Sequence, residues 1–300
     1  MKQVVHHPLH NAALLKLEQF HLGLKEPHEI RCMLITGESG SGKTTLVNEY
    51  MSRFPFERHP NVDVRRVLYV RAPSRSSVKS LGLHILRKLG GPIIPRMSDF
   101  EVSLCVRKLL CEMGVELLFI DEVQDLLEWK PTSNKIPKLV ANFIKEILQE
   151  TNTGIVLMGS PSIEVIPTLE VQLGNRTGEG ISLDSLRAAD AEERAAYREY
   201  LAVAVKEWSL PVELDLSDNL TALRFQVATD GRFSLTNKVL HIAKNRAALE
   251  KSPSVRAKHF EYAFVIMNDS NEQKIDPFKM GKDDLLAWVE VDAMRQFNRM

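Results

Sequence analysis

One eight-residue segment constrains the fold of this chain more than any other. Residues 37–44 read Gly-Glu-Ser-Gly-Ser-Gly-Lys-Thr and match GxxxxGK[ST], the pattern of a phosphate-binding loop. The segment follows a short apolar run, residues 32–36, and precedes a helical pattern at residues 44–54. A strand, a glycine-rich loop and a helix in this order surround a phosphate with backbone N–H groups and a helix N-terminus. The motif therefore predicts a nucleotide-binding α/β domain.

Strands and helices alternate along the first part of the chain. Apolar runs predict four further strands, at residues 67–70, 116–120, 155–158 and 180–183. Helical patterns lie around and between them, at residues 9–24, 77–89, 99–113 and 137–150. Asp99 stands near the start of one of these helices and is a candidate N-cap. This alternation predicts a parallel sheet with helices on both faces.

The pattern changes near residue 186, where the strand-like runs stop. Four helical patterns follow, at residues 192–208, 218–229, 234–249 and 254–267. They predict a small all-helical lid domain after the α/β domain. The expected organisation is a leader with an N-terminal helix (1–28), a nucleotide-binding domain (29–186), a lid (187–268) and a tail (269–300). The tail has mixed character and is a candidate segment for docking a partner.

Composition limits how the chain can meet its partners. Lys plus Arg is 39 and Asp plus Glu is 39, so the formal net charge is zero. Nucleic acid contacts must therefore come from a local basic surface, repeated by oligomerisation, and not from bulk charge. No apolar run reaches the roughly 18–20 residues of a membrane span, and the N-terminus lacks the features of a secretory signal. The three cysteines have no metal-type spacing, which favours reduced thiols in a cytoplasmic protein.

The residues of the loop and of a later acid pair predict ATP and Mg²⁺ chemistry. Lys43 is expected to contact the β- and γ-phosphates, and the Thr44 hydroxyl to ligate Mg²⁺. An apolar run ends in Asp121 and Glu122. Asp121 is expected to hold Mg²⁺ through water, and Glu122 to polarise the attacking water, which indicates a hydrolase. The expected nucleotide-binding residues are Gly37, Glu38, Ser39, Gly40, Ser41, Gly42, Lys43, Thr44 and Thr45.

Three further side chains are candidates for sensing or completing the phosphate site. Ser160 follows the fourth predicted strand and is a candidate γ-phosphate sensor. Arg176 follows a short helical segment, where a ring-forming ATPase places an arginine finger for the neighbouring subunit. Arg232 opens a helix of the lid and is a candidate link between lid position and nucleotide.

The order of these motifs resembles that of an AAA+ ATPase. Within that class the chain resembles the TniB/TnsC family of transposition regulators over roughly residues 9–267. The resemblance rests on three segments, which are the loop 37–45, Val70-Arg71-Ala72-Pro73 and Ile120-Asp121-Glu122-Val123-Gln124. The segment 174–178 departs from the family pattern, because no phenylalanine follows Arg176.

This resemblance implies a function. Such proteins assemble on double-stranded DNA when bound to ATP, recruit a DDE transposase and take part in target-site choice. It further implies a bacterial cytoplasmic protein, sequence-independent DNA contact, and a target-selecting adaptor as a further partner. The implied DNA-facing residues are Arg71, Arg75 and Lys79, after the second strand.

Alternatives remain open at this stage. One is an AAA+ replication initiator or loader, in which an added winged-helix or helix-turn-helix domain is expected. After residue 267 only 33 residues of this sequence remain, which favours the transposition regulator. The others are a small-molecule kinase of the P-loop type and a nucleotide-gated scaffold with negligible turnover. Steady-state ATP hydrolysis with and without duplex DNA separates them.

Overall fold

The computed structural model describes residues 8–26, 29–59, 63–74, 77–92, 96–127, 135–268 and 275–297. The chain divides into two compact units. The first is built from Ala13–Ser39 and Lys43–Leu183, and the second mainly from Asp184–Met300. Among the described residues, no helix combines the length and the apolar character that crossing a membrane requires.

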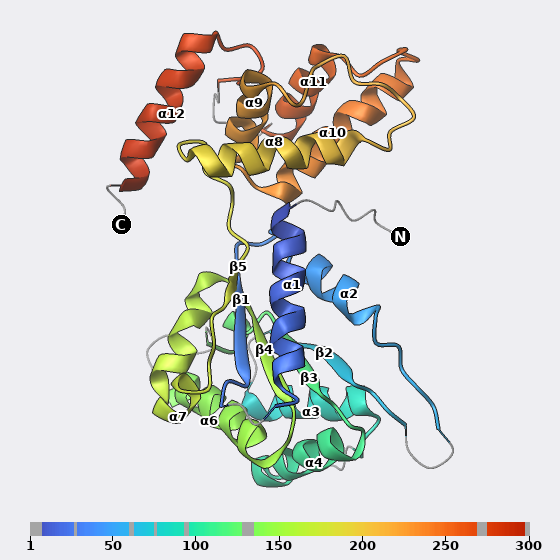
Figure 1. Cartoon of the computed structure of the whole chain (residues 1–300), viewed down its shortest axis with the longest axis vertical. Helices are drawn as coiled ribbons and strands as arrows, with labels where there is room; N and C mark the ends of the chain where they lie inside the picture. The colour runs from blue at the N-terminus through green and yellow to red at the C-terminus, as the bar shows by residue number, and fades with distance from the viewer. Residues whose placement is uncertain are drawn as a thin grey trace. The chain divides into compact units, whose positions relative to one another are not determined.

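A five-stranded parallel sheet forms the centre of the first unit (Figure 1). Its strands are β1 (Cys32–Thr36), β2 (Val67–Arg71), β3 (Leu117–Asp121), β4 (Gly154–Gly159) and β5 (Ile181–Ser182). Their order across the sheet is β2-β3-β4-β1-β5. β1, β3 and β4 are buried along their whole length, which is why they are continuous apolar runs in the sequence. All five strands predicted from the sequence are present.

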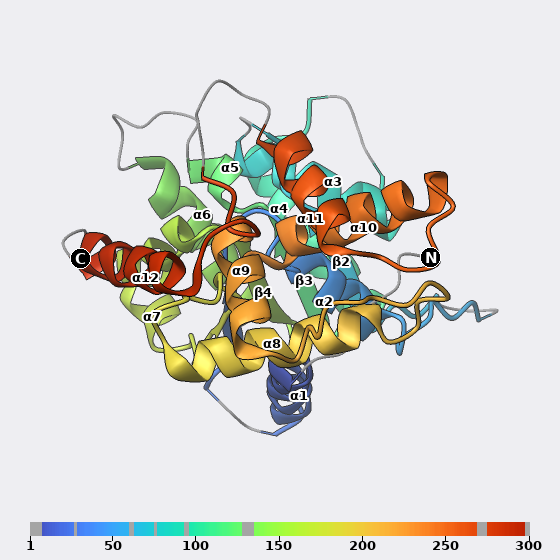
Figure 2. The ribbon, with the colours of Figure 1, turned by 90° about the horizontal axis from the view of Figure 1, so that it is seen from above.

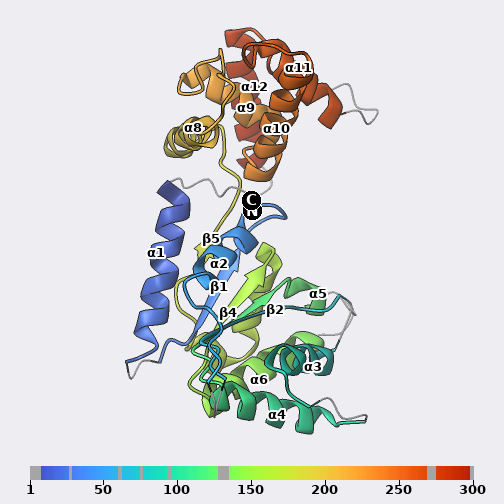
Figure 3. The ribbon, with the colours of Figure 1, turned by 90° about the vertical axis from the view of Figure 1, so that its right-hand side faces the viewer.

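Helices cover both faces of this sheet, as predicted, because successive strand residues point to opposite sides. Leu34, Leu118 and Leu157 pack into a core on the side of α3, α4 and α6. Met33, Phe119 and Met158 pack into a second core on the side of α1 and α2. Figure 3 shows α1 on one side of the sheet and α3, α4 and α6 on the other. The helices of this unit are α1 (Pro8–Gly23), α2 (Lys43–Met51), α3 (Val78–Leu89), α4 (Asp99–Glu112), α5 (Gln124–Leu127), α6 (Lys135–Glu150), the 3₁₀ helix η1 (Pro161–Leu169) and α7 (Val171–Gly174).

The N-cap expected at Asp99 is wrong by one residue. Ser98 caps α4, because its hydroxyl accepts a hydrogen bond from the Glu101 N–H at 3.2 Å. The Glu101 carboxylate accepts in return from the Ser98 N–H at 2.6 Å, which completes a capping box. Asp99 is instead the first helical residue.

The second unit is helical. Its helices are α8 (Ala191–Val205), α9 (Asn219–Thr229), α10 (Phe233–Leu249), α11 (Ala257–Met267) and α12 (Lys282–Phe297). Tyr197, Phe225 and Phe260 are fully buried in the core that α8 to α11 share. No element was predicted for the tail, which contains α12; Leu285 and Val289 of this helix pack against Leu223 and Val227 of α9. Figure 2 shows α12 beside α9.

Candidate functional site

The glycine-rich loop lies at the carboxyl end of β1. Gly40 and Gly42 have φ values of 82° and 102°, which side chains rarely tolerate, so the backbone bends here without strain. The Gly37 N–H donates to the Gly159 carbonyl at 3.1 Å and ties the loop to β4. Lys43 opens α2, is only 8% exposed, and donates through Nζ to the carbonyls of Gly37 at 2.5 Å and Glu38 at 3.0 Å. The loop therefore holds a buried cation at its centre.

One atom of the loop indicates that it is built for a ligand. The Ser41 hydroxyl oxygen is buried and has no hydrogen-bond partner. A buried hydroxyl without a partner is costly, and a phosphate oxygen in the loop would accept its proton. Glu38, Ser39 and Thr45 have exposed side chains, so a ligand in the loop would meet their backbone N–H groups first.

The predicted magnesium residues lie in contact. Asp121 ends β3 and is 2% exposed. The Thr44 hydroxyl donates to Asp121 Oδ2 at 3.2 Å, so the start of α2 and the end of β3 share one polar site. Within the described residues no group of three His, Cys or carboxylate side chains could hold a metal by itself. A hydroxyl and one carboxylate suit Mg²⁺, which commonly takes its other ligands from water and phosphate.

Tyr69 is a member of this site that the sequence analysis missed. Its hydroxyl donates to Asp121 Oδ2 at 2.5 Å from the neighbouring strand β2. Burial, followed by the hydrogen bond to Asp121, raises the pKa of Tyr69 far above its usual range. The phenol therefore stays protonated and fixes the orientation of the Asp121 carboxylate. The only signal in the sequence is a tyrosine among aliphatic residues of a buried strand.

Glu122 has an unusual backbone conformation, and its side chain has two partners. Its φ of 55° lies in the left-handed region, which is rare for a residue other than glycine. Its Oε1 lies 3.5 Å from the Arg71 guanidinium, and its Oε2 accepts a hydrogen bond from the Gln124 amide. The side chain predicted to activate water is thus engaged with protein groups.

Gln124 connects this carboxylate to the end of β4. Its Oε1 accepts from the Ser160 N–H at 3.2 Å, while its Nε2 donates to Glu122. Ser160 follows Gly159, which pairs with Thr36 at the end of β1, so the candidate sensor lies beside the start of the loop. The Ser160 hydroxyl is hydrogen-bonded to the Ser162 hydroxyl at 2.7 Å. The contacts of Gln124 with Glu122 and Ser160 were not predicted from the sequence.

The structure places Arg176 far from the glycine-rich loop of the same chain. The Arg176 carbonyl accepts hydrogen bonds from the N–H groups of Arg31 and Cys32, both at 2.9 Å, at the amino end of β1. The loop begins at the other end of this strand, roughly 13 Å away at about 3.3 Å per residue. Arg176 is therefore not part of the site that Lys43 and Asp121 form.

The candidate lid residue and the residues expected to face DNA lie in different parts of the structure. Arg232 belongs to the second unit, where it precedes α10 and pairs with Asp230 at 2.9 Å. Lys79 lies on α3 and pairs with Asp99 of α4 at 3.7 Å. Arg71 ends β2 and pairs with Glu122, while Arg75 lies outside the described residues.

Comparisons with known proteins agree with this architecture. A family model described as "Bacterial TniB protein" matches residues 1–179. No curated protein sequence matches the chain. The solved structure of Cdc6p from Pyrobaculum aerophilum is similar with a TM-score of 0.63 and 16% identity, over 88% of this chain and 69% of that one.

Two other solved structures share the fold. The ORC1 protein of Aeropyrum pernix, solved in complex with DNA, has a TM-score of 0.61 and 18% identity, over 88% of this chain and 66% of its own. The RuvB Holliday junction branch migration motor of Thermotoga maritima has a TM-score of 0.52 and 15% identity, over 91% and 72%. At these identities the likeness establishes the fold, and it confirms the predicted AAA+ architecture.

Proposed function

The chain belongs to the bacterial TniB protein family, and we propose that it is an ATPase that assembles on duplex DNA and recruits or activates a DDE transposase at the target site. The observation that carries the ATPase part is the Thr44–Asp121 hydrogen bond. It brings the phosphate-binding loop and the acid pair at the end of β3 together in one partly buried polar site. Family membership supports the transposition part, and the DNA complex of the similar ORC1 protein supports DNA as a partner.

Each residue of the site has its own role in the proposed hydrolysis of ATP. The loop N–H groups and Lys43 would bind the phosphates, and Thr44 and Asp121 would hold Mg²⁺, with Tyr69 fixing the Asp121 carboxylate. Bound Mg²⁺ neutralises charge on the phosphates. Glu122 accepts a hydrogen bond from the attacking water and orients it. Glu122 is paired with Arg71 and Gln124, and these two partners compete with the attacking water for its carboxylate.

Arg71 then links DNA to hydrolysis. It is one of the residues expected to face DNA, and its guanidinium lies 3.5 Å from Glu122. A DNA phosphate that attracts Arg71 would release the carboxylate. Arg71→Ala is expected to raise DNA-free ATP turnover several-fold and to reduce the stimulation by duplex. Steady-state phosphate release with and without duplex measures both effects.

Arg66→Ala is the matched control, since Arg66 stands just before β2 at the other end of the strand. It should leave DNA-free turnover unchanged. Arg71→Ala turnover that equals the wild type without DNA, and still rises with DNA, would show that this ion pair does not restrain Glu122.

The DNA part is tested by a salt titration of duplex binding. One subunit has a net charge of zero and can neutralise only a few DNA phosphates. ATP should therefore raise the affinity for duplex DNA by assembling many subunits, whose basic residues then line up along the DNA phosphates. Binding should be sequence-independent, and each neutralised phosphate should contribute about −0.9 to the slope of log affinity against log salt. Replacing Arg75 and Lys79 together by alanine should flatten this slope and leave DNA-free ATP binding intact.

The control for this pair is Lys108→Ala, which removes an exposed cation of α4 paired with Glu112. Equal salt slopes for the wild type and the Arg75/Lys79 variant would show that neither residue contacts DNA. Affinity that does not depend on ATP would contradict the assembly mechanism.

A replication initiator or loader is the second candidate function, because Cdc6p shares the fold with the highest of the TM-scores given above. The two functions differ in the protein partner. Co-sedimentation of the DDE transposase of the same element with the ATP-assembled protein on duplex DNA supports the first. Retention of a replicative helicase and not the transposase supports the second.

A further inference from the structure

The segment between α2 and β2 forms an arm at the edge of the sheet. Its two halves pair in antiparallel fashion, because Glu57 and Val64 exchange N–H to carbonyl hydrogen bonds at 3.1 and 2.9 Å. Figure 1 shows this segment extending away from the sheet before the chain returns to β2, which is itself an edge strand. None of the described residues of the arm, 52–59 and 63–66, is buried. The arm is therefore a surface feature and not part of a core.

An aromatic ring of the arm holds two arginines in place. The Arg65 guanidinium lies 4.7 Å from the centre of the Phe56 ring, and the Arg58 guanidinium lies 5.9 Å from it. Such contacts between a cation and a ring face are stabilising. Arg65 also donates through Nη1 to the Lys88 carbonyl at 2.7 Å, which ties the arm to the end of α3. The two guanidinium groups are thus positioned by the protein at its surface.

The positive charge of this region is not balanced by the protein. Four cations of the arm and of the last turn of α3 form no ion pair with any carboxylate of the described residues: Arg58, Arg65, Arg87 and Lys88. Of the two acids in the described part of the arm, Glu57 pairs with His59 at 3.3 Å, and Asp63 is exposed. The region therefore carries an excess of positive charge on a chain whose net charge is zero.

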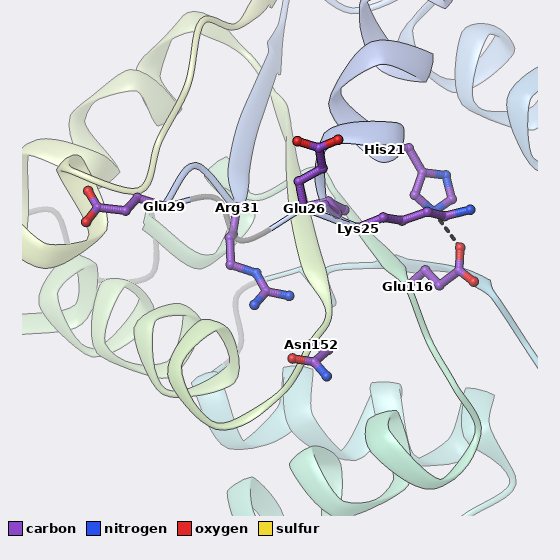
Figure 4. A pocket seen from close by; sticks show the side chains of 8 residues that line it. His21, Lys25, Glu26, Glu29, Arg31, Glu116 and Asn152 are labelled. Atoms are coloured by element: carbon purple, nitrogen blue, oxygen red, sulfur yellow. Dashed lines mark hydrogen bonds and ion pairs between the residues drawn. The ribbon is translucent and has the colours of Figure 1, made fainter.

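The cavity next to the base of the arm has a different character. Glu116, whose N–H donates to the Arg66 carbonyl at 2.8 Å, is one of its lining residues. Figure 4 shows Glu116 paired with His21, and the two groups lie 3.1 Å apart. Three carboxylates line this cavity together with two cations and the histidine: Glu26, Glu29, Glu116, Lys25, Arg31 and His21. Charges of both signs do not favour a ligand with many phosphates, so the arm suits such a ligand better.

Duplex DNA fits the chemistry of the arm. Planar guanidinium groups donate paired N–H groups to phosphate oxygens, and Arg58 and Arg65 lie on one ring. Surfaces for single strands stack unpaired bases on aromatic side chains. Two guanidinium groups already lie over Phe56, so this ring has little face to offer a base. Contact with the phosphates of a duplex needs only the cations.

We propose that the arm surface, defined as Phe56, Arg58, Arg65, Arg87 and Lys88, is a second surface that binds the phosphate backbone of duplex DNA. It is separate from the residues expected to face DNA after β2. Arg66 precedes this strand and Arg71 ends it, so roughly 17 Å of chain separate the two ends at about 3.3 Å per residue. Each subunit thus contacts the duplex at two places, an inference that rests on the proposed binding of duplex DNA.

The test is a salt titration of duplex binding, with ATP present, for the double variant Arg58→Ala/Arg65→Ala. Each neutralised phosphate contributes about −0.9 to the slope of log affinity against log salt. Loss of two contacts should therefore make the slope shallower by about 1.8 for each subunit on the DNA. Arg58→Lys/Arg65→Lys keeps both charges and should keep most of the slope.

Arg246→Ala is the matched control. Arg246 also lies over an aromatic ring, 4.5 Å from the centre of Tyr262, but its charge is balanced by Glu250 at 2.6 Å. Its replacement should leave the salt slope unchanged. ATP turnover without DNA should equal that of the wild type in all these variants, which also shows that they are folded.

Each outcome bears on the proposal. A wild-type slope in Arg58→Ala/Arg65→Ala would overturn it and leave the proposed function standing. An equal loss of slope in the lysine variant, or a loss of DNA-free turnover in the alanine variant, would indicate a structural role for the arm and would also overturn it. Polyglutamate that displaces labelled duplex as well as unlabelled duplex does, at equal charge, would favour an acidic protein partner instead. A wild type that does not bind duplex DNA would overturn both this proposal and the DNA part of the proposed function.

Discussion

Replacing Arg176 by alanine is expected to lower ATP turnover by about 10³- to 10⁵-fold, the range in which an arginine finger acts. The guanidinium stabilises the charge that develops on the transferred phosphoryl group. ATP binding by the unassembled subunit should not change, because Arg176 lies at the amino end of β1 and the loop lies at its carboxyl end. Single-turnover hydrolysis, together with equilibrium ATP binding, separates the two effects.

The control for Arg176→Ala is Arg53→Ala, which removes an exposed arginine paired with Glu18 at 3.4 Å. Its turnover should equal that of the wild type. Mixing Arg176→Ala with Lys43→Ala subunits should restore part of the activity, because each supplies what the other lacks. Failure to restore activity in mixed, folded oligomers would contradict a site shared between subunits.

Replacing Glu122 by glutamine is expected to preserve ATP binding and to lower hydrolysis by about 10²- to 10⁴-fold, the usual contribution of a positioned acid or base. The amide keeps the shape of the side chain and loses the negative charge that orients water. The assembly on duplex DNA should therefore persist longer in ATP than that of the wild type. Dissociation after dilution, followed by fluorescence of labelled duplex, measures its lifetime.

Glu164→Gln is the matched control for Glu122→Gln. Glu164 accepts a hydrogen bond from the Thr36 hydroxyl at 3.3 Å near the end of β1, so it is a carboxylate of the same region with a different partner. Its turnover should stay near the wild-type rate. A Glu122→Gln assembly that dissociates at the wild-type rate in ATP would contradict the idea that hydrolysis controls release.

The central part of the site could be predicted because its signals are local. The glycines, Lys43 and Thr44 follow one another in the sequence, and the acid pair directly follows an apolar strand. The order and parallel pairing of strands then bring both segments to one edge of the sheet. The structure places Thr44 in contact with Asp121 as this argument requires.

The contacts of Tyr69, Arg71 and Gln124 could not be predicted, because they depend on strand register. Arg71 lies opposite Asp121 only because β2 and β3 pair in the observed register. A shift of one residue would turn the Tyr69 side chain to the other face of the sheet. Gln124 reaches Ser160 because β3 and β4 are neighbours, although 36 residues separate the two positions.

Helix α12 in the tail could not be predicted for a different reason. The core-facing signal of α12 is carried mainly by Leu285 and Val289, one helical turn apart, among charged residues. Two apolar residues do not predict a buried helix face by themselves; they are buried because they pack against Leu223 and Val227 of α9. Packing against a helix that lies some 60 residues earlier in the chain decides the structure here, and a local window of sequence does not contain that helix.

The most direct test of the proposed function is steady-state ATP hydrolysis by the wild type and by Lys43→Ala, each with and without duplex DNA. The wild type should hydrolyse ATP and do so faster with duplex of any sequence. Lys43→Ala should lose hydrolysis under both conditions, because the loop loses the cation that lies at its centre. Equal turnover by the two proteins, or wild-type turnover that duplex DNA leaves unchanged, would contradict a DNA-dependent ATPase built on this loop.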